Sequence, residues 1–192
     1  MSLVLNSSGG GSVTIQEPST ASNLTVSIPP ASGTLSLPTL LTAQTASGTS
    51  VDFSGATGIP SWAKRITVMF SGVSTSGTSN IIIQLGTSSG FVTSGYLGTV
   101  SNQSGGSTSN FTSGFMTSVS IAAADIMHGA VDLVNITGNT WVGRGITAYS
   151  NQVALRTSAG SIALAGTLDR VRITTVNGTD TFDAGIINIL YE

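Results

Sequence analysis

The sequence predicts an all-β protein: an antiparallel β-sandwich or jelly roll with an extended N-terminal β arm. Alternating runs rich in β-branched residues dominate the chain, and the two stretches with helical character, residues 61–64 and 121–127, are each long enough for only a turn or two. Turn signals such as Asn177-Gly178 separate many of these runs, as in antiparallel hairpins. An apolar fraction of 40% is sufficient for a core between two sheets.

The composition describes an unusual surface. Charged residues make up 7% of the chain, against about 25% in ordinary soluble domains. Serine, threonine, glycine and asparagine take their place, and short hydroxyl side chains lose little entropy when they are held rigid. Such a surface is typical of extracellular and virion β proteins.

The charge and the sequence pattern also argue against binding to nucleic acid, against membrane association and against a secretory signal. A net charge of -2 leaves no basic field for nucleic acid or for an anionic membrane. No stretch of apolar residues is long enough to span a bilayer, and the N-terminus lacks the basic start of a secretory signal. With no cysteine, stability is expected from packing or oligomerisation.

Residues 1–48 are expected to form an arm or shaft that attaches or oligomerises the protein. Runs 12–16 and 23–28 alternate, but prolines interrupt the segment and confine its strands to edges or an extended arm. Residues 40–48 are interpreted as a linker. We expect neighbouring subunits to order the arm, with a flexible tail as the alternative.

Residues 49–192 are expected to form the sandwich domain. Residues 63–73 predict a strand with Ile66, Val68 and Phe70 on one face, and residues 80–85 predict a strand covered on both faces. The glycine- and serine-rich stretch between 86 and 114 is interpreted as long loops with short strands.

Hairpins are expected from residue 129 onward. The predicted strands are 131–136, 141–149, 153–156 and 162–164, with a turn at Ala159-Gly160. Residues 168–176 and 182–191 are predicted to pair across Asn177-Gly178. The last strand is apolar on both faces, which predicts a central position or an oligomer contact.

Residues suited to catalysis are few, and we predict no enzyme, no cofactor and no metal site. The single histidine, His128, lacks a neighbouring motif for a serine nucleophile or a zinc site. Asp180 and Asp183 flank Phe182 and are interpreted as turn-capping residues. A cation site at the two aspartates, or an acid pair that cleaves glycans, is the alternative.

Aromatic rings offer the remaining candidate contacts, because sugars stack on exposed rings. The candidates for glycan contact are Trp62, Tyr96, Phe111 and Trp141. For Trp62 and Trp141 a packing role is preferred; for Tyr96 and Phe111 both roles stay open. Residues 90–114 are the preferred region for a loop that contacts a receptor.

Two sets of motifs resemble bacteriophage tail-fibre and prophage virion structural proteins. Residues 9–15 (GGGSVTI), 24–29 (LTVSIP) and 32–35 (SGTL) resemble the β arm of such proteins. Residues 60–68 (PSWAKRITV), 169–175 (DRVRITT) and 188–192 (NILYE) are similar to their globular β end domain. The resemblance implies a trimeric virion fibre or decoration protein and no catalytic residue.

These observations together predict a structural subunit of a phage virion, of tail-fibre or tail-tip adhesion type. We expect a homotrimer that binds other virion proteins through its arm and contacts host surface polysaccharide through its sandwich. It would be made in the host cytoplasm and released by lysis. The alternatives are a capsid decoration, cement or head-fibre protein and, from another class, a small polysaccharide-active enzyme.

Overall fold

A computed structural model describes residues 2–6, 8–10, 12–16, 37–55, 58–123 and 125–192. Of these described residues, 58% lie in strands and none in an α-helix, and the sheets are antiparallel, which confirms the predicted all-β sandwich. Within the described ranges, no helix is long and apolar enough to cross a membrane. The chain forms two compact units, Met1–Leu35 and Ser36–Glu192.

The described part of the first unit, within residues 2–16, forms an antiparallel hairpin. Strand β1 (Ser2–Asn6) pairs with β2 (Ser12–Gln16) from Ser2 opposite Gln16 to Asn6 opposite Ser12. The predicted strand at 12–16 is therefore confirmed. The run predicted at 23–28 lies outside the described residues.

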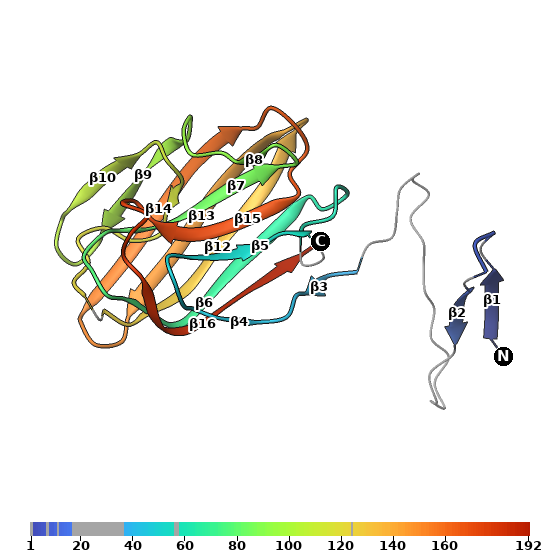
Figure 1. The fold of residues 1–192 in the computed structure, drawn as a ribbon, viewed down its shortest axis with the longest axis horizontal. Helices are drawn as coiled ribbons and strands as arrows, with labels where there is room; N and C mark the ends of the chain where they lie inside the picture. Colours follow the sequence, from blue (N-terminus) through green and yellow to red (C-terminus); the bar gives the residue numbers. More distant parts are fainter. Residues whose placement is uncertain (1, 7, 11, 17–36, 56–57, 124) are drawn as a thin grey trace. The chain divides into compact units, whose positions relative to one another are not determined.

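The second unit is a sandwich of two antiparallel sheets, which lie face to face in Figure 1. The nine-stranded sheet, here the large sheet, has the order β10-β9-β14-β13-β12-β6-β16-β3, and β4 also pairs with β16. Its strands are β3 (Thr39–Leu40), β4 (Gln44–Thr45), β6 (Arg65–Thr75), β9 (Leu97–Asn102), β10 (Thr108–Phe111), β12 (Met127–Thr137), β13 (Thr140–Tyr149), β14 (Ala154–Ala163) and β16 (Phe182–Tyr191).

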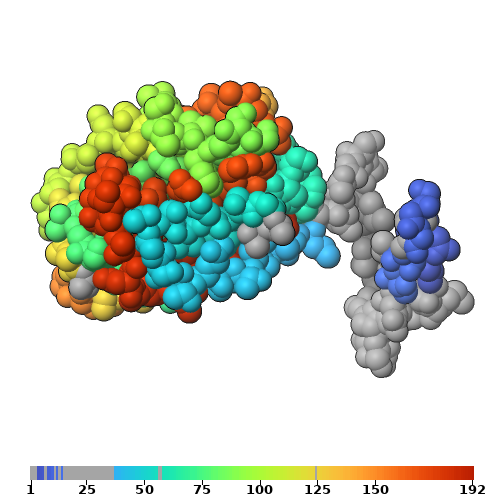
Figure 2. Space-filling model, viewed as in Figure 1, coloured from blue at the N-terminus to red at the C-terminus, as the bar shows by residue number. Residues whose placement is uncertain are grey.

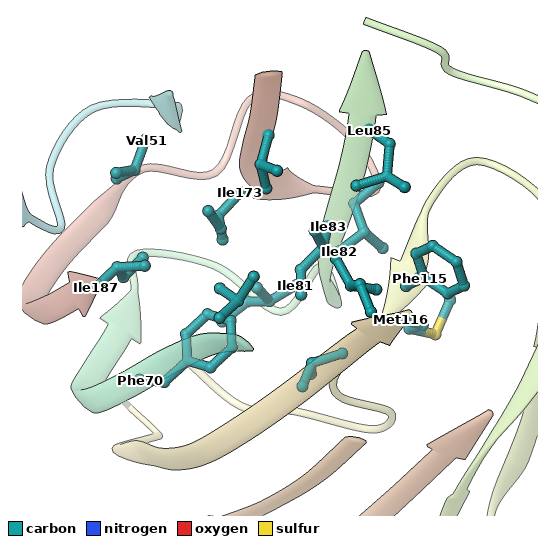
Figure 3. Packing of buried hydrophobic residues seen from close by; sticks show 14 of the residues in the cluster. Val51, Phe70, Ile81, Ile82, Ile83, Leu85, Phe115, Met116, Ile173 and Ile187 are labelled. Atoms are coloured by element: carbon teal, nitrogen blue, oxygen red, sulfur yellow. The ribbon is translucent and has the colours of Figure 1, made fainter. Parts of the chain in front are cut away.

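The five-stranded sheet, here the small sheet, has the order β11-β7-β15-β5, with β8 on β7. Its strands are β5 (Ser50–Phe53), β7 (Ile81–Thr87), β8 (Gly90–Phe91), β11 (Phe115–Met116) and β15 (Arg170–Thr175). The core lies between the sheets. In Figure 3, Ile173 of the small sheet faces the layer that holds Phe70 and Ile187 of the large sheet.

The central strands follow the sequence prediction closely. Every residue of β7 is buried, as expected for a strand covered on both faces. On β6, Ile66 and Val68 are fully buried and Phe70 is nearly so, which confirms the predicted inward face. The neighbouring residues on β6 turn outward because side chains alternate along a strand.

The predicted C-terminal hairpin is wrong. Strand β15 pairs with β7 and β5 in the small sheet, whereas β16 pairs with β6 in the large sheet. The Asn177-Gly178 pair, which predicted a two-residue hairpin turn, lies inside a longer connection between the two sheets. There the Asn177 side-chain oxygen accepts hydrogen bonds from the backbone N–H groups of Thr179 and Asp180, at 3.0 and 3.2 Å. Gly178 supplies the turn's positive φ of 69° without a hairpin.

Strand β16 does have neighbours on both sides. It pairs with β6 along one edge and with the short strands β3 and β4 along the other. The prediction that this strand does not form a free edge is therefore confirmed. On β16, Ile187 and Ile189 are fully buried, whereas Ile186 is 51% exposed.

The structure assigns residues 37–48 to the sandwich and not to the arm. The expected linker pairs with β16, and Ala46 is buried and donates its N–H to the Gly185 carbonyl at 2.9 Å. Figure 2 shows this blue-to-cyan segment lying along the sandwich beside the red C-terminal strand. The boundary expected at 48/49 moves to Ser36, because β16 gains a covered edge from these residues.

Glycines on the inner face of the large sheet make room for aromatic rings. A Cβ at Gly98 would lie 2.2 Å from the Phe111 ring, and one at Gly160 would lie 2.6 Å from it. A Cβ at Gly143 would lie 2.8 Å from the ring of Phe115. The predicted turn at Ala159-Gly160 is therefore wrong: β14 runs through both residues, and Gly160 serves packing.

A pair of truncations tests the new boundary. Deleting residues 1–36 should leave the melting temperature of the sandwich within a few degrees of the full chain. Deleting residues 1–47 should lower stability further, because it removes β3, β4, Ala46 and backbone hydrogen bonds to β16 such as Leu41 N–H to Ile189 O. Each lost bond contributes about 0.5–1.5 kcal/mol.

Thermal unfolding of the two proteins, followed by circular dichroism, is the measurement. Equal melting temperatures for the two truncations would contradict the assignment of residues 37–48 to the sandwich.

Candidate functional site

Three of the four candidate glycan contacts lie in the core. Tyr96, Phe111 and Trp141 are at most 4% exposed, so none of their rings can stack on a sugar. The Tyr96 hydroxyl accepts a hydrogen bond from Leu85 N–H at 2.7 Å and donates to Val92 O at 3.0 Å. Burial raises the pKa of Tyr96 above its ordinary value. The preferred packing role of Trp141 is therefore confirmed, and for Tyr96 and Phe111 the open choice between packing and glycan contact is decided in favour of packing.

Trp62 is the candidate ring that reaches solvent. It is 43% exposed and packs edge-on against Tyr191, with 5.5 Å between ring centroids. It precedes β6, next to the point where the backbone N–H groups of Lys64 and Arg65 donate to the Glu192 carbonyl. The preferred interpretation, that Trp62 packs where the strand starts, agrees with this contact.

Asp180 lies in the connection between the sheets, which agrees with a turn-capping role, whereas Asp183 lies on β16, so a turn-capping role is wrong for it. Asp180 accepts hydrogen bonds from the Asn177 side chain at 2.7 Å and from Ser79 N–H at 2.9 Å. These two bonds, the Asn177 bond foremost, lower the pKa of Asp180. Asp183 accepts a hydrogen bond from the Ser74 hydroxyl on β6. In the described part of the chain, no three His, Asp or Glu side chains cluster to hold a metal ion.

His128 lies beside a serine, but in the wrong tautomer for a catalytic relay. Its Nδ1 accepts the Gly72 N–H at 3.2 Å, so the proton of the neutral ring lies on Nε2. Nε2 is 3.3 Å from the Ser150 hydroxyl and donates to it. A serine nucleophile needs an unprotonated Nε2 to take its proton. His128 therefore holds β6 and the turn after β13 in place.

Arg156 is a buried cation that the sequence did not single out. It is 1% exposed, and its guanidinium donates to Val119 O at 2.9 Å and to the Asn102 side-chain oxygen at 2.8 Å. The guanidinium also lies 5.1 Å from the centroid of the Tyr149 ring, whose pKa burial raises to about 12. These contacts anchor the loop before β12 to β14 and β9, a structural role.

A polar groove runs over the outer face of the small sheet. Arg172 forms a two-bond ion pair with Asp52 at 2.7 and 2.6 Å and lies 4.1 Å from the centroid of the Phe91 ring. Hydroxyl and amide groups provide most of the lining of the groove, which consists of Thr49, Ser50, Gln84, Thr93, Ser113, Arg172, Thr174, Thr175, Val176, Asn177 and Gly178. The sequence could not reveal this groove, because Asp52 and Arg172 meet only through the pairing of β5 with β15.

The outer face of the large sheet is the other notable surface. Exposed apolar side chains on four adjacent strands, β12, β13, β14 and β9, face solvent there: Val134, Val142, Ile146, Leu155 and Leu97. Arg144 and Asp132 lie opposite each other in the middle of this face, 3.6 Å apart. The sequence shows apolar and polar residues alternating along β13, but it does not show which face of the strand is left exposed.

Comparison with known proteins found no match to a protein-family model, to a curated protein or to a solved structure.

The Asp180 contacts predict a pH-dependent contribution to stability. A carboxyl whose pKa is lowered by folding stabilises the fold above its ordinary value of 3.8, and this contribution is lost as the pH falls below that value toward the folded pKa. Asp180→Asn should lower the melting temperature at pH 7, and the difference from the wild type should shrink below about pH 4.

Thermal unfolding between pH 2.5 and about pH 7 measures this difference. Thr179→Ala, at an exposed position in the same connection, is the control and should show no such trend. A difference between Asp180→Asn and the wild type that is the same at all pH values would contradict the role of the ionised carboxyl.

Proposed function

We propose that the chain is a structural subunit of a bacteriophage virion, of tail-fibre or tail-tip type, that works by assembly and surface contact. The observation that carries the proposal is the broad outer face of the large sheet, where apolar and hydroxyl side chains dominate and the arginines lie beside acids. A face of this kind suits contact with another protein surface better than solvation. The motifs of the sequence that resemble phage fibre proteins support the same function.

The two-unit organisation fits this function. The N-terminal hairpin and the sandwich are separately compact, so one can attach to other virion proteins while the other is displayed. A homotrimer is the proposed assembly, since closed symmetry protects sheet edges that have little charge to keep them apart.

Host polysaccharide is the proposed partner of the displayed sandwich. The groove on the small sheet supports it, because its hydroxyl, amide and guanidinium groups are the short polar partners that orient a sugar. Phe91 lies beneath Arg172 and keeps the guanidinium in place by a cation–π contact. This location replaces the three buried rings considered from the sequence.

Immunogold labelling of phage particles with antibodies against the sandwich tests the proposed function. Particles purified from lysates that contain the chain should carry label on the tail. Label on the head would favour the capsid decoration or head-fibre alternative. Particles without any label would contradict a virion subunit.

Incubation of the full chain with host surface polysaccharide separates contact from cleavage. We expect the protein to co-sediment with the polysaccharide and to leave its chain length unchanged. Shortened polysaccharide would overturn the non-enzymatic proposal and favour the polysaccharide-active enzyme.

A further inference from the structure

The strand register defines a continuous outer face on the large sheet. Across one row, Ala159 on β14 lies opposite Arg144 on β13, which lies opposite Asp132 on β12, which lies opposite Thr67 on β6. Residues two positions along each strand point the same way. The neighbouring rows therefore place Val142 beside Val134, and Ile146 beside Ala130, on the same face.

The charges at the centre of this face compensate one another. Asp132 lies 3.6 Å from Arg144 and 3.8 Å from Arg65, and Arg65 also pairs with Glu192 at 3.0 Å. Asp132 further accepts the Thr67 hydroxyl at 2.8 Å. Two arginines and two carboxylates thus form a neutral group, so this face can meet another copy of the chain without net repulsion.

The shape of the face has both projections and recesses. Ile146 and Leu97 project from it, with 61% and 69% of each residue exposed. Two shallow hollows flank Arg144: Val134, Val142 and Ala159 line part of one, and Ala130 and Ile146 line part of the other. Apolar projections on one copy can fill apolar hollows on its neighbour in a closed oligomer.

The size of the face matches a stable interface. Strand β13 has ten residues, which gives a length of about 34 Å at about 3.4 Å per residue. Five adjacent strands, from β9 to β6, give a width of about 24 Å at about 4.8 Å per strand. The product of about 800 Å² equals the area that each partner buries in a standard protein interface.

We infer that the outer face of the large sheet, centred on Ile146 and Arg144, is the contact surface between copies of this chain. The inference rests on the proposed function and deepens it, since it names the surface through which the subunits of the virion protein associate. In a closed trimer, the copies of this face turn toward the threefold axis, so Ile146 of one subunit contacts the same region of its neighbours. The neutral charge, the apolar projections and hollows, and the area of this face together favour a second copy of the chain, and not a charged partner, as the molecule that it contacts.

The test compares two matched substitutions in the full chain. Ile146→Asp puts a charge in the centre of the contact, and Val153→Asp puts the same charge at a 95% exposed turn position away from it. Light scattering at micromolar concentration should report an oligomer for the wild type and for Val153→Asp. Ile146→Asp should raise the dissociation constant by on the order of tenfold or more, with an unchanged circular dichroism spectrum.

Cross-linking adds a readout that does not depend on weakening the contact. The chain has no cysteine, so Ile146→Cys and Val153→Cys each introduce one thiol. Under oxidation, Ile146→Cys should form covalent dimers within the native oligomer and Val153→Cys should not. If Ile146→Asp leaves the oligomer intact and Ile146→Cys does not cross-link, another face holds the subunits together.

The two proposals fail separately. A wild-type chain that is monomeric at these concentrations overturns the inference, whatever the labelling of particles shows. Particles without label overturn the proposed function even if the purified chain associates through Ile146.

Discussion

The packing of Phe111 and Phe115 against glycines of the large sheet is the interaction on which the rest of the structure depends. The large sheet has nine strands and the small sheet five, so the small sheet alone cannot cover the inner face of β9, β13 and β14. The two rings, 6.0 Å apart and steeply inclined to each other, contribute to that cover. They come close enough only because positions 98, 143 and 160 carry no side chain.

The proposed contact surface depends on the same packing. Strands β9, β13 and β14 carry glycines and aromatic contacts on one face and Leu97, Ile146 and Leu155 on the other. If the inner face were loosely packed, these strands could shift and the outer rows of side chains would lose their register. A rigid inner face therefore keeps the outer face available as a defined surface for assembly.

Local patterns predicted strands well and long-range pairing poorly. The inward face of β6 and the fully buried β7 followed from alternation and from an isoleucine run. The pairing of β15 with β7, and of β16 with β6, joins segments far apart in the chain, which no local pattern records. Asn177-Gly178 predicted a turn correctly but not which sheet the chain would enter next.

The candidate site shows the same division. The aromatic residues could be named from the sequence, but their burial could not be predicted. Tyr96 and Phe111 are buried, and a local pattern does not reveal whether a side chain points toward the other sheet. The groove around Arg172 depends on Asp52, a partner 120 residues away. Gly160 was interpreted as a turn residue, since the sequence does not show that the Phe111 ring occupies the space beside it.

A double-mutant cycle on Gly160 and Phe111 tests the glycine–aromatic packing most directly. Gly160→Ala should destabilise the sandwich by at least about 1–3 kcal/mol, the usual cost of overpacking a core, because the added Cβ would meet both the Phe111 ring and the Leu97 carbonyl oxygen, 2.5 Å away. Gly166→Ala is the matched control, because a Cβ there would lie 3.7 Å from Thr87 in ordinary contact. In the Phe111→Leu background, Gly160→Ala should cost at least about 0.5 kcal/mol less, as expected for residues in contact. Chemical denaturation measures these values; a Gly160→Ala variant as stable as Gly166→Ala, or a cost unchanged by Phe111→Leu, would contradict the account.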